Sequence, residues 1–269
     1  MHVTTPSDRW AAGDAYESFM GRWSRQVAAL FLDWLALPPS LNWLDVGCGT
    51  GALSEAICRR SPPQSLVGCD PSPDFVSFAG ARSVPNCPTA FVIASADSLP
   101  MRVGGFDVIV SGLVLNFLPQ PLTAVQSMKE RLRPGGMLAA YVWDYSEGMQ
   151  FLRTFWEEAT VVVPSAADLD EGRRFPLCRP GALAELLTNG GLKAVATTSL
   201  QIQMSFPSFD DFWSPFRGGT GPAPSFVASL DVHARAQLAL RLKARLRPSA
   251  DGAIRLTARA FGVRGIRAL

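Results

Sequence analysis

A cluster of glycines separates a short apolar run from a helical segment near the start of the chain. The run at Leu41–Val46 has the length of a buried strand. It ends in Gly47, Gly49 and Gly51, and apolar residues return at helical spacing over Leu53–Arg60. Glycines at such a junction allow a tight turn and let a ligand approach the main-chain N–H groups at the start of a helix. The pattern therefore predicts a strand–turn–helix unit with a ligand site at the turn.

The same alternation of apolar runs and helical patterns continues to about residue 143. Further apolar runs lie at 65–70, 90–94, 106–113 and 137–143, and helices are expected over 14–36 and 122–132. Clusters of glycine and proline separate these segments. Because short strands alternating with helices indicate βαβ units, we predict an α/β fold with a mostly parallel sheet.

The pattern changes after residue 143. Two long strands are expected over 193–206 and 253–263, and two segments, 145–178 and 207–250, are rich in aromatic residues. These two insertions fit two alternatives. They can form a lid over an apolar substrate pocket, or they can pack together as the core of a subdomain or as a dimer surface.

Composition excludes several classes of protein. The 269 residues are 48% hydrophobic, and the net charge of +2 comes with arginines that are scattered rather than gathered in one stripe. We therefore expect no nucleic-acid partner, and a solvated face where arginines are densest, between Arg241 and Arg259. The first ten residues lack the apolar core of a signal peptide, and the longest apolar run is too short to cross a bilayer. We expect a cytoplasmic protein with no membrane partner; the sequence does not indicate its oligomeric state.

The five cysteines follow no metal-binding pattern. They form no C-x-x-C pair and have no neighbouring histidine, so neither a zinc site nor a disulfide framework is expected. Reduced thiols, as in a cytoplasm, are the expectation.

Three acidic residues favour a nucleoside sulfonium over a dinucleotide at the glycine turn. Gly47, Gly49 and Ala52 loosely satisfy the dinucleotide fingerprint. Asp45, however, stands two residues before the first of these glycines, where it suits a cationic amino group and would repel a pyrophosphate. Asp70 ends the next apolar run and can accept both hydroxyls of a ribose, and Asp97 follows the third run, where it can accept from an adenine amino group.

Five short motifs carry a resemblance to a known family. They are L-D-V-G-C-G-T-G at 44–51, C-D-P-S at 69–72, A-D-S-L-P at 96–100, F-D-V-I-V-S at 106–111 and L-R-P-G-G at 132–136. In order and spacing, over about residues 40–143, the set resembles the class I S-adenosylmethionine methyltransferases. It is most similar to the small-molecule group that includes the ubiquinone and menaquinone biosynthesis methyltransferases. Where that group often has a histidine, this chain has Asn116.

The resemblance implies a fold, a cofactor and a reaction. The fold is a Rossmann-like seven-stranded sheet with its last strand antiparallel. The cofactor is S-adenosylmethionine, and the reaction is methyl transfer to a small-molecule acceptor. It also implies three parts: an N-terminal helical segment over the cofactor (1–40), the cofactor-binding core (41–144), and a C-terminal part (145–269) with both insertions and the final strand pair.

The expected cofactor site draws on both the motifs and the N-terminal segment. In related enzymes that segment folds over the cofactor, and an arginine there can hold the methionine carboxylate, which makes Tyr16 and Arg22 the candidates. The residues expected at the cofactor are Tyr16, Arg22, Asp45, Gly47, Cys48, Gly49, Asp70, Pro71, Ser72, Ala96, Asp97, Ser98, Ser111, Gly112 and Asn116. No metal site is expected.

The acceptor is expected above the carboxyl ends of the fourth and fifth strands. Asp144 and Tyr145 lie there and are candidates for a general base, with the alternative that they are loop or pocket-wall residues. Two rival functions stay open. One is a non-catalytic module that keeps the cofactor pocket. The other is an NAD(P)-dependent oxidoreductase, against which the lack of a Tyr-x-x-x-Lys pair argues.

Overall fold

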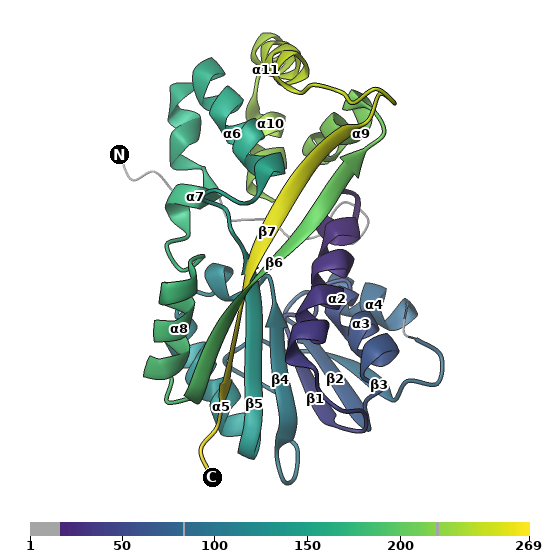
Figure 1. The fold of residues 1–269 in the computed structure, drawn as a ribbon, viewed down its shortest axis with the longest axis vertical. Coiled ribbons are helices and arrows are strands. Elements are labelled where there is room, and N and C mark those ends of the chain that lie inside the picture. Colours follow the sequence, from purple (N-terminus) through teal and green to yellow (C-terminus); the bar gives the residue numbers. More distant parts are fainter. Residues whose placement is uncertain (1–16, 83, 219–220) are drawn as a thin grey trace.

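A single twisted sheet organises the chain (Figure 1), as seen in a computed structural model that describes residues 17–82, 84–218 and 221–269. The strands are β1 (Asn42–Val46), β2 (Ser65–Asp70), β3 (Thr89–Ile93), β4 (Phe106–Gly112), β5 (Leu132–Trp143), β6 (Lys193–Phe206) and β7 (Ile254–Ile266). Within the described residues these seven strands lie in the order β3-β2-β1-β4-β5-β7-β6. The pairs from β3 to β5 are parallel, whereas β7 runs antiparallel to β5 and to β6. The predicted Rossmann-like sheet with an antiparallel last strand is confirmed.

Helices cover both faces of this sheet. Before β6 the helical segments are η1 (Glu17–Gly21), α2 (Arg22–Leu35), α3 (Ala52–Arg60), α4 (Pro73–Ala81), η2 (Leu115–Phe117), α5 (Pro121–Arg131), α6 (Gln150–Val162), η3 (Pro164–Asp168), α7 (Glu171–Arg174) and α8 (Pro180–Asn189). After β6 they are α9 (Phe209–Trp213), η4 (Ser214–Arg217), α10 (Pro222–Ser229) and α11 (Val232–Arg245). Helices α2, α3 and α4 lie on one side of the sheet, and α5 and α8 on the other (Figure 1). In the part of the chain described, no helix is long and apolar enough to cross a membrane.

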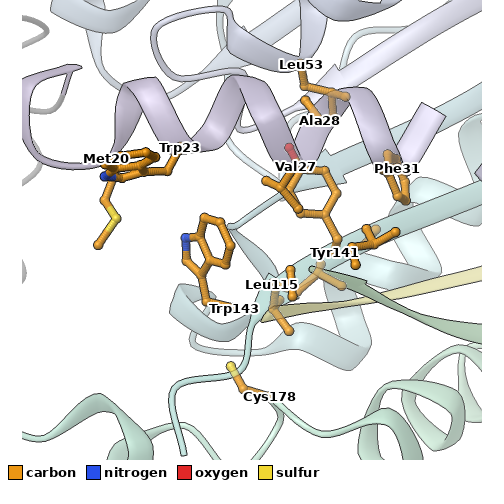
Figure 2. Packing of buried hydrophobic residues seen from close by; sticks show 14 of the residues in the cluster. Met20, Trp23, Val27, Ala28, Phe31, Leu53, Leu115, Tyr141, Trp143 and Cys178 are labelled. Atoms are coloured by element: carbon orange, nitrogen blue, oxygen red, sulfur yellow. The ribbon is translucent and has the colours of Figure 1, made fainter. Parts of the chain in front are cut away.

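The central strands are buried because both of their faces are covered by helices. Strand β1 is buried from Trp43 to Val46, as expected for a parallel strand between two helical layers. Strand β5 is buried from Leu138 onward, and Figure 2 shows its Tyr141 and Trp143 facing the helix that carries Trp23. This packing fixes the carboxyl ends of the strands, where the loops of the candidate site begin.

The two insertions pack against each other over the upper half of β6. Phe151 and Phe155 of α6 meet Phe216 of η4 with ring centroids 4.6 Å and 4.4 Å apart. Phe206, at the end of β6, stacks on Phe151 at 5.4 Å, and Phe212 of α9 joins the same cluster. All five rings are buried. These five residues, from the two insertions and the end of β6, therefore form one buried aromatic cluster.

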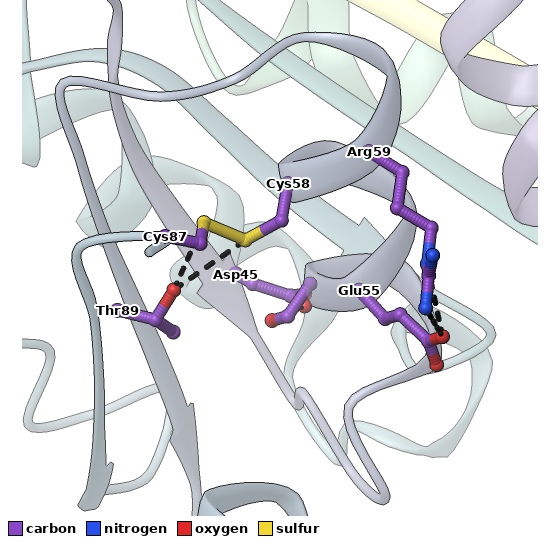
Figure 3. The surroundings of a disulfide bond; sticks show 7 residues. Asp45, Glu55, Cys58, Arg59, Cys87 and Thr89 are labelled. Carbon is purple, nitrogen blue, oxygen red and sulfur yellow. Dashed lines mark hydrogen bonds and ion pairs between the residues drawn. A yellow bond between two sulfur atoms is a disulfide. The ribbon is translucent and has the colours of Figure 1, made fainter. Parts of the chain in front are cut away.

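A disulfide joins Cys58 to Cys87, and the expectation of reduced thiols throughout is wrong at this pair. Figure 3 shows the bond linking the last turn of α3 to the segment that precedes β3, next to Thr89. Sequence spacing gave no signal, because the cysteines are 29 residues apart and only the fold brings their Cα atoms to 5.9 Å. Cys48, Cys69 and Cys178 are free and buried.

The basic stretch near the C-terminus is paired with acids. Arg241 and Arg245 of α11 donate to the carboxylate of Glu158 on α6, at 2.8 Å and 3.0 Å. Arg259 of β7 donates to Asp144 at 2.6 Å. Part of the predicted solvated face therefore forms ion pairs with other elements of the fold. The sequence gave no signal of these pairs because the partners are far apart along the chain.

Candidate active site

A cavity of about 690 Å³ opens at the carboxyl ends of β1, β4 and β5. Val46, Gly112 and Trp143, which end these three strands, line it. Strands β1 and β4 are neighbours at the point where the strand order reverses, and such a switch point is where open α/β sheets bind their ligands. The volume lies within the usual range for small-molecule sites.

Asp45 lies at this cavity and has one carboxylate oxygen without a hydrogen-bond partner among the described residues. The side chain is completely buried and lines the cavity. Ser54 of α3 donates its hydroxyl to Oδ2 at 2.7 Å, while Oδ1 has no partner among the described residues. Burial raises the pKa of Asp45 from 3.8 to about 7, against the lowering effect of the Ser54 hydrogen bond. A buried oxygen without a donor is a site for a ligand that brings one.

The glycine turn forms a backbone cradle beside Asp45. Gly47 and Gly49 both have left-handed φ angles, 73° and 53°. A Cβ on Gly47 would lie 2.5 Å from the Val114 side chain, so that approach requires glycine. A Cβ on Gly49 would meet nothing within 4 Å, because this glycine faces the open cavity. Cys48 also lines the cavity; burial raises the pKa of its thiol, so the sulfur stays protonated.

Asp70 organises the next loop. It ends β2 and accepts the main-chain N–H groups of Gly49 at 3.0 Å and Ser72 at 2.9 Å. Pro71 lines the cavity, and Ser72 caps α4 by accepting from the Phe75 N–H at 3.4 Å. Burial raises the pKa of Asp70, and the two N–H donors oppose that rise. The carboxylate therefore ties the glycine turn to the loop after β2.

The remaining expected cofactor residues divide between the cavity and its support. Ala96, Asp97 and Gly112 line the cavity. Ser111 is buried behind it and donates to the Val46 carbonyl at 2.9 Å, and Ser98 accepts from the Ser95 N–H at 3.3 Å. The side-chain amide of Asn116 is buried with no partner among the described residues.

Arg22 lies away from the cavity. Its guanidinium pairs with Asp211 of α9 at 3.0 Å and stacks on the rings of Trp23 and Phe206. The structure therefore gives its predicted role, holding the methionine carboxylate, no support. Tyr16 lies outside the described residues.

The same N-terminal segment nevertheless covers the site. Phe19, Met20 and Ser24 line the cavity. The carboxylate of Glu17 accepts the Thr50 hydroxyl of the glycine turn at 2.5 Å, which ties η1 to that turn.

The two candidate bases differ in placement. Asp144 is buried and accepts from Arg259 at 2.6 Å and from the Ser146 hydroxyl at 2.9 Å. It is not among the residues that line the cavity, so it acts as a structural ion-pair partner. Tyr145 does line the cavity, with its ring 5.6 Å from that of Phe175.

Glu171 is a cavity residue that the sequence did not single out. It begins α7 in the first insertion, is 2% exposed and lines the cavity. The Trp156 indole N–H donates to its carboxylate. Burial raises its pKa from 4.5 to about 7. Its sequence context is a run of charged residues, which reads as a solvated loop, and only the packing of α7 shows that this acid faces inward.

Comparison with known proteins shows a similarity to one domain family. The methyltransferase domain family matches residues 44–140, the segment that holds the glycine turn and β1 to β5. Over these residues, which make up less than half of the chain, the sequence is similar to methyltransferase domains.

Two curated relatives and one solved structure illustrate the likeness. A trans-aconitate 2-methyltransferase of Deinococcus radiodurans is 32% identical over 165 residues, 60% of this chain and 61% of the relative. A malonyl-[acyl-carrier protein] O-methyltransferase of Herminiimonas arsenicoxydans is 37% identical over 127 residues, 47% of this chain and 46% of the relative. A phosphoethanolamine N-methyltransferase 2 of Haemonchus contortus, solved with S-adenosylhomocysteine, shares the fold at a TM-score of 0.59 and 15% identity, over 96% of this chain and 57% of that one. The chain thus spans about half to three fifths of each of these proteins.

The residues of the candidate site fit S-adenosylmethionine, the cofactor that the sequence predicts. The free Oδ1 of Asp45 offers an acceptor to the cationic amino group, and the open face of Gly49 leaves space for the ligand against the main chain. Asp97 stands at the loop after β3, within the same cavity.

Proposed function

We propose that the protein transfers a methyl group from S-adenosylmethionine to a small-molecule acceptor and releases S-adenosylhomocysteine. The observation that carries the proposal is the pairing of an orphaned buried carboxylate oxygen on Asp45 with a glycine cradle in one cavity. A cationic amino acid moiety satisfies that oxygen, whereas a pyrophosphate would be repelled by it.

The protein's own contribution is binding, orientation and exclusion of water, because the bound cofactor supplies the electrophilic methyl group. Asp45 would hold the amino group, the main chain at Gly49 would lie along the ligand, and Asp97 would accept from the adenine amino group. Phe19 and Met20 of η1 and Trp143 of β5 line the cavity with apolar surface. Such walls align the acceptor with the methyl group and keep water from competing.

Two further predictions about the site belong to the same proposal. The division into a covering segment (1–40), a cofactor-binding core (41–144) and a C-terminal part (145–269) accords with the tie between Glu17 and Thr50. A lid role for the insertions is supported by Leu152, Glu171 and Pro222, which line the cavity from segments 145–178 and 207–250. The absence of a nucleic-acid partner and a location in the cytoplasm stay predictions.

Formation of S-adenosylhomocysteine from S-adenosylmethionine, measured over a panel of small molecules, tests the proposal. The site variant Asp45→Asn is expected to reduce turnover of any acceptor that the wild type methylates. A non-catalytic module would bind S-adenosylhomocysteine in calorimetry yet methylate nothing. An oxidoreductase would instead be stabilised against heat by NAD(P), by roughly 2.7 kcal/mol at 100 times the dissociation constant.

A further inference from the structure

The described residues that line the cavity include acids but no cation. Among the described residues that line it, Asp45, Asp97 and Glu171 are acidic, and none is a lysine, an arginine or a histidine. Asp45 lies near the end of β1 and Asp97 on the loop after β3, at the end of the cavity proposed for the cofactor. Glu171 comes from the first insertion, together with aromatic and aliphatic side chains such as Tyr145 and Leu152.

Glu171 is held at the carboxyl end of β5. The backbone of the next residue packs against the chain that leaves this strand, since a Cβ on Gly172 would lie 2.8 Å from the carbonyl oxygen of Tyr145. On the other side, the indole of Trp156 donates to the carboxylate, and this tryptophan is 1% exposed. Asp170 accepts the Gly172 N–H at 2.8 Å, which fixes the turn. The carboxylate therefore has a defined position where acceptors bind in this fold.

The charges around Glu171 leave it able to take up a proton. Its pKa is raised to about 7, mainly by burial; Asp170 contributes to the rise, whereas the hydrogen bonds to the carboxylate, including that from Trp156, and the charge of Arg174 oppose it. Arg153 pairs with Asp170 rather than with Glu171. Across the cavity stand the carboxylates of Asp45 and Asp97. A carboxylate that titrates close to neutral pH suits proton transfer.

We propose that Glu171 is the general base for an apolar acceptor that presents a hydroxyl group, such as a phenol. The proposal rests on the methyl transfer proposed above. In the step, the hydroxyl proton moves to the Glu171 carboxylate, and the oxygen forms a bond to the methyl carbon. The bond from that carbon to sulfur breaks, its electron pair stays on sulfur, and S-adenosylhomocysteine leaves. The proton passes from Glu171 to solvent after product release.

Charge excludes the other acceptor classes. A carboxylate acceptor would enter a cavity whose described lining holds three acids and no counter-ion. A protonated amine would place a second cation beside the sulfonium. A neutral hydroxyl avoids both, and the oxyanion that forms as its proton leaves is attracted to the sulfonium.

The test compares wild type, Glu171→Gln and the matched control Glu157→Gln, which changes a half-exposed glutamate on α6 that pairs with Arg245. The probes are 4-propylphenol, 4-propylbenzoic acid and 4-propylbenzylamine, each with S-adenosylmethionine. We expect wild type and the Glu157 variant to methylate the phenol alone. Glu171→Gln should lose about 100-fold or more in kcat/KM while binding S-adenosylhomocysteine within about threefold of wild type.

The pH profile separates a base from a merely structural residue. In wild type, kcat/KM for the phenol should rise up to about pH 7 and then level, because Glu171 must be deprotonated. In Glu171→Gln it should keep rising toward pH 9, because the phenol itself must ionise, with a pKa near ~10. If the variant does not fold, the wild-type profile decides alone.

Several results would overturn the assignment of Glu171. They are methylation of the benzoic acid or the benzylamine in preference to the phenol, no turnover of the phenol, or a wild-type profile with no plateau. If wild type did not bind S-adenosylhomocysteine at all, the proposed function itself would be wrong. Calorimetry distinguishes the two failures.

Discussion

Asp45→Asn should make the unliganded protein more stable at alkaline pH while it weakens cofactor binding. The pKa of this fully buried carboxyl rises from 3.8 in the unfolded chain to about 7 in the folded protein. A carboxyl with a raised pKa stabilises the folded state only below its unfolded value, and that contribution is lost as the pH rises through the folded value. Three pKa units correspond to about 4 kcal/mol. Wild type should lose this amount relative to the variant between about pH 4 and pH 7.

Urea unfolding of both proteins at pH 5 and pH 8 measures the effect. The stability of Asp45→Asn relative to wild type should be greater at pH 8 than at pH 5, with most of the expected change falling in this interval. Asp97→Asn, at an exposed position of the same cavity, should show the same change in unfolding free energy between pH 5 and pH 8 as wild type. In calorimetry Asp45→Asn should bind S-adenosylhomocysteine about 10- to 100-fold more weakly, the loss of a charge-assisted hydrogen bond. A stability difference that is the same at both pH values would refute the reasoning.

Three further predictions concern the cradle, the disulfide and the N-terminal arginine. Gly49→Ala puts a methyl group into the cavity at a left-handed φ of 53°, so it should cost about 1–2 kcal/mol in urea unfolding and at least tenfold in S-adenosylhomocysteine affinity; unchanged affinity would contradict the cradle. The double variant Cys58→Ser/Cys87→Ser opens a link that spans 29 residues and should unfold about 3–4 kcal/mol more easily, and equal stability of the two proteins would argue against the bond. Arg22→Ala should leave S-adenosylhomocysteine affinity within about threefold but lower stability by about 1–2 kcal/mol through its lost contacts to Asp211 and two rings; a tenfold loss of affinity would restore its predicted role at the cofactor.

The fold was largely predictable because its determinants are local. The turn at Gly47 and the apolar run before it predicted β1 and its junction with α3, and the long runs at 193–206 and 253–263 predicted β6 and β7. Each of these signals lies within a few residues of the element that it specifies. Along the first half of the chain, repetition of the same unit then indicated the parallel part of the sheet.

The less predictable part of the site depends on contacts between distant segments. Arg22 lies on a helix whose rotation decides whether it faces the cavity, and its partner Asp211 is 189 residues away. Asp144 became an ion-pair partner because β7 brings Arg259 beside it across 115 residues. Glu171 gives no periodic signal, and its burial depends on how the two insertions pack. These long-range contacts decide which charged side chains face the cavity and which are paired elsewhere. The acceptor class therefore could not be predicted from the sequence.

The most direct test of the cofactor site is a crystal structure of the protein with S-adenosylhomocysteine. We predict that the ligand lies in the cavity at the carboxyl ends of β1 and β4, with its amino group within hydrogen-bond distance of Asp45 Oδ1 and its chain along Gly49. An unoccupied cavity at saturating ligand, or a ligand whose amino group lies far from Asp45, would contradict the account.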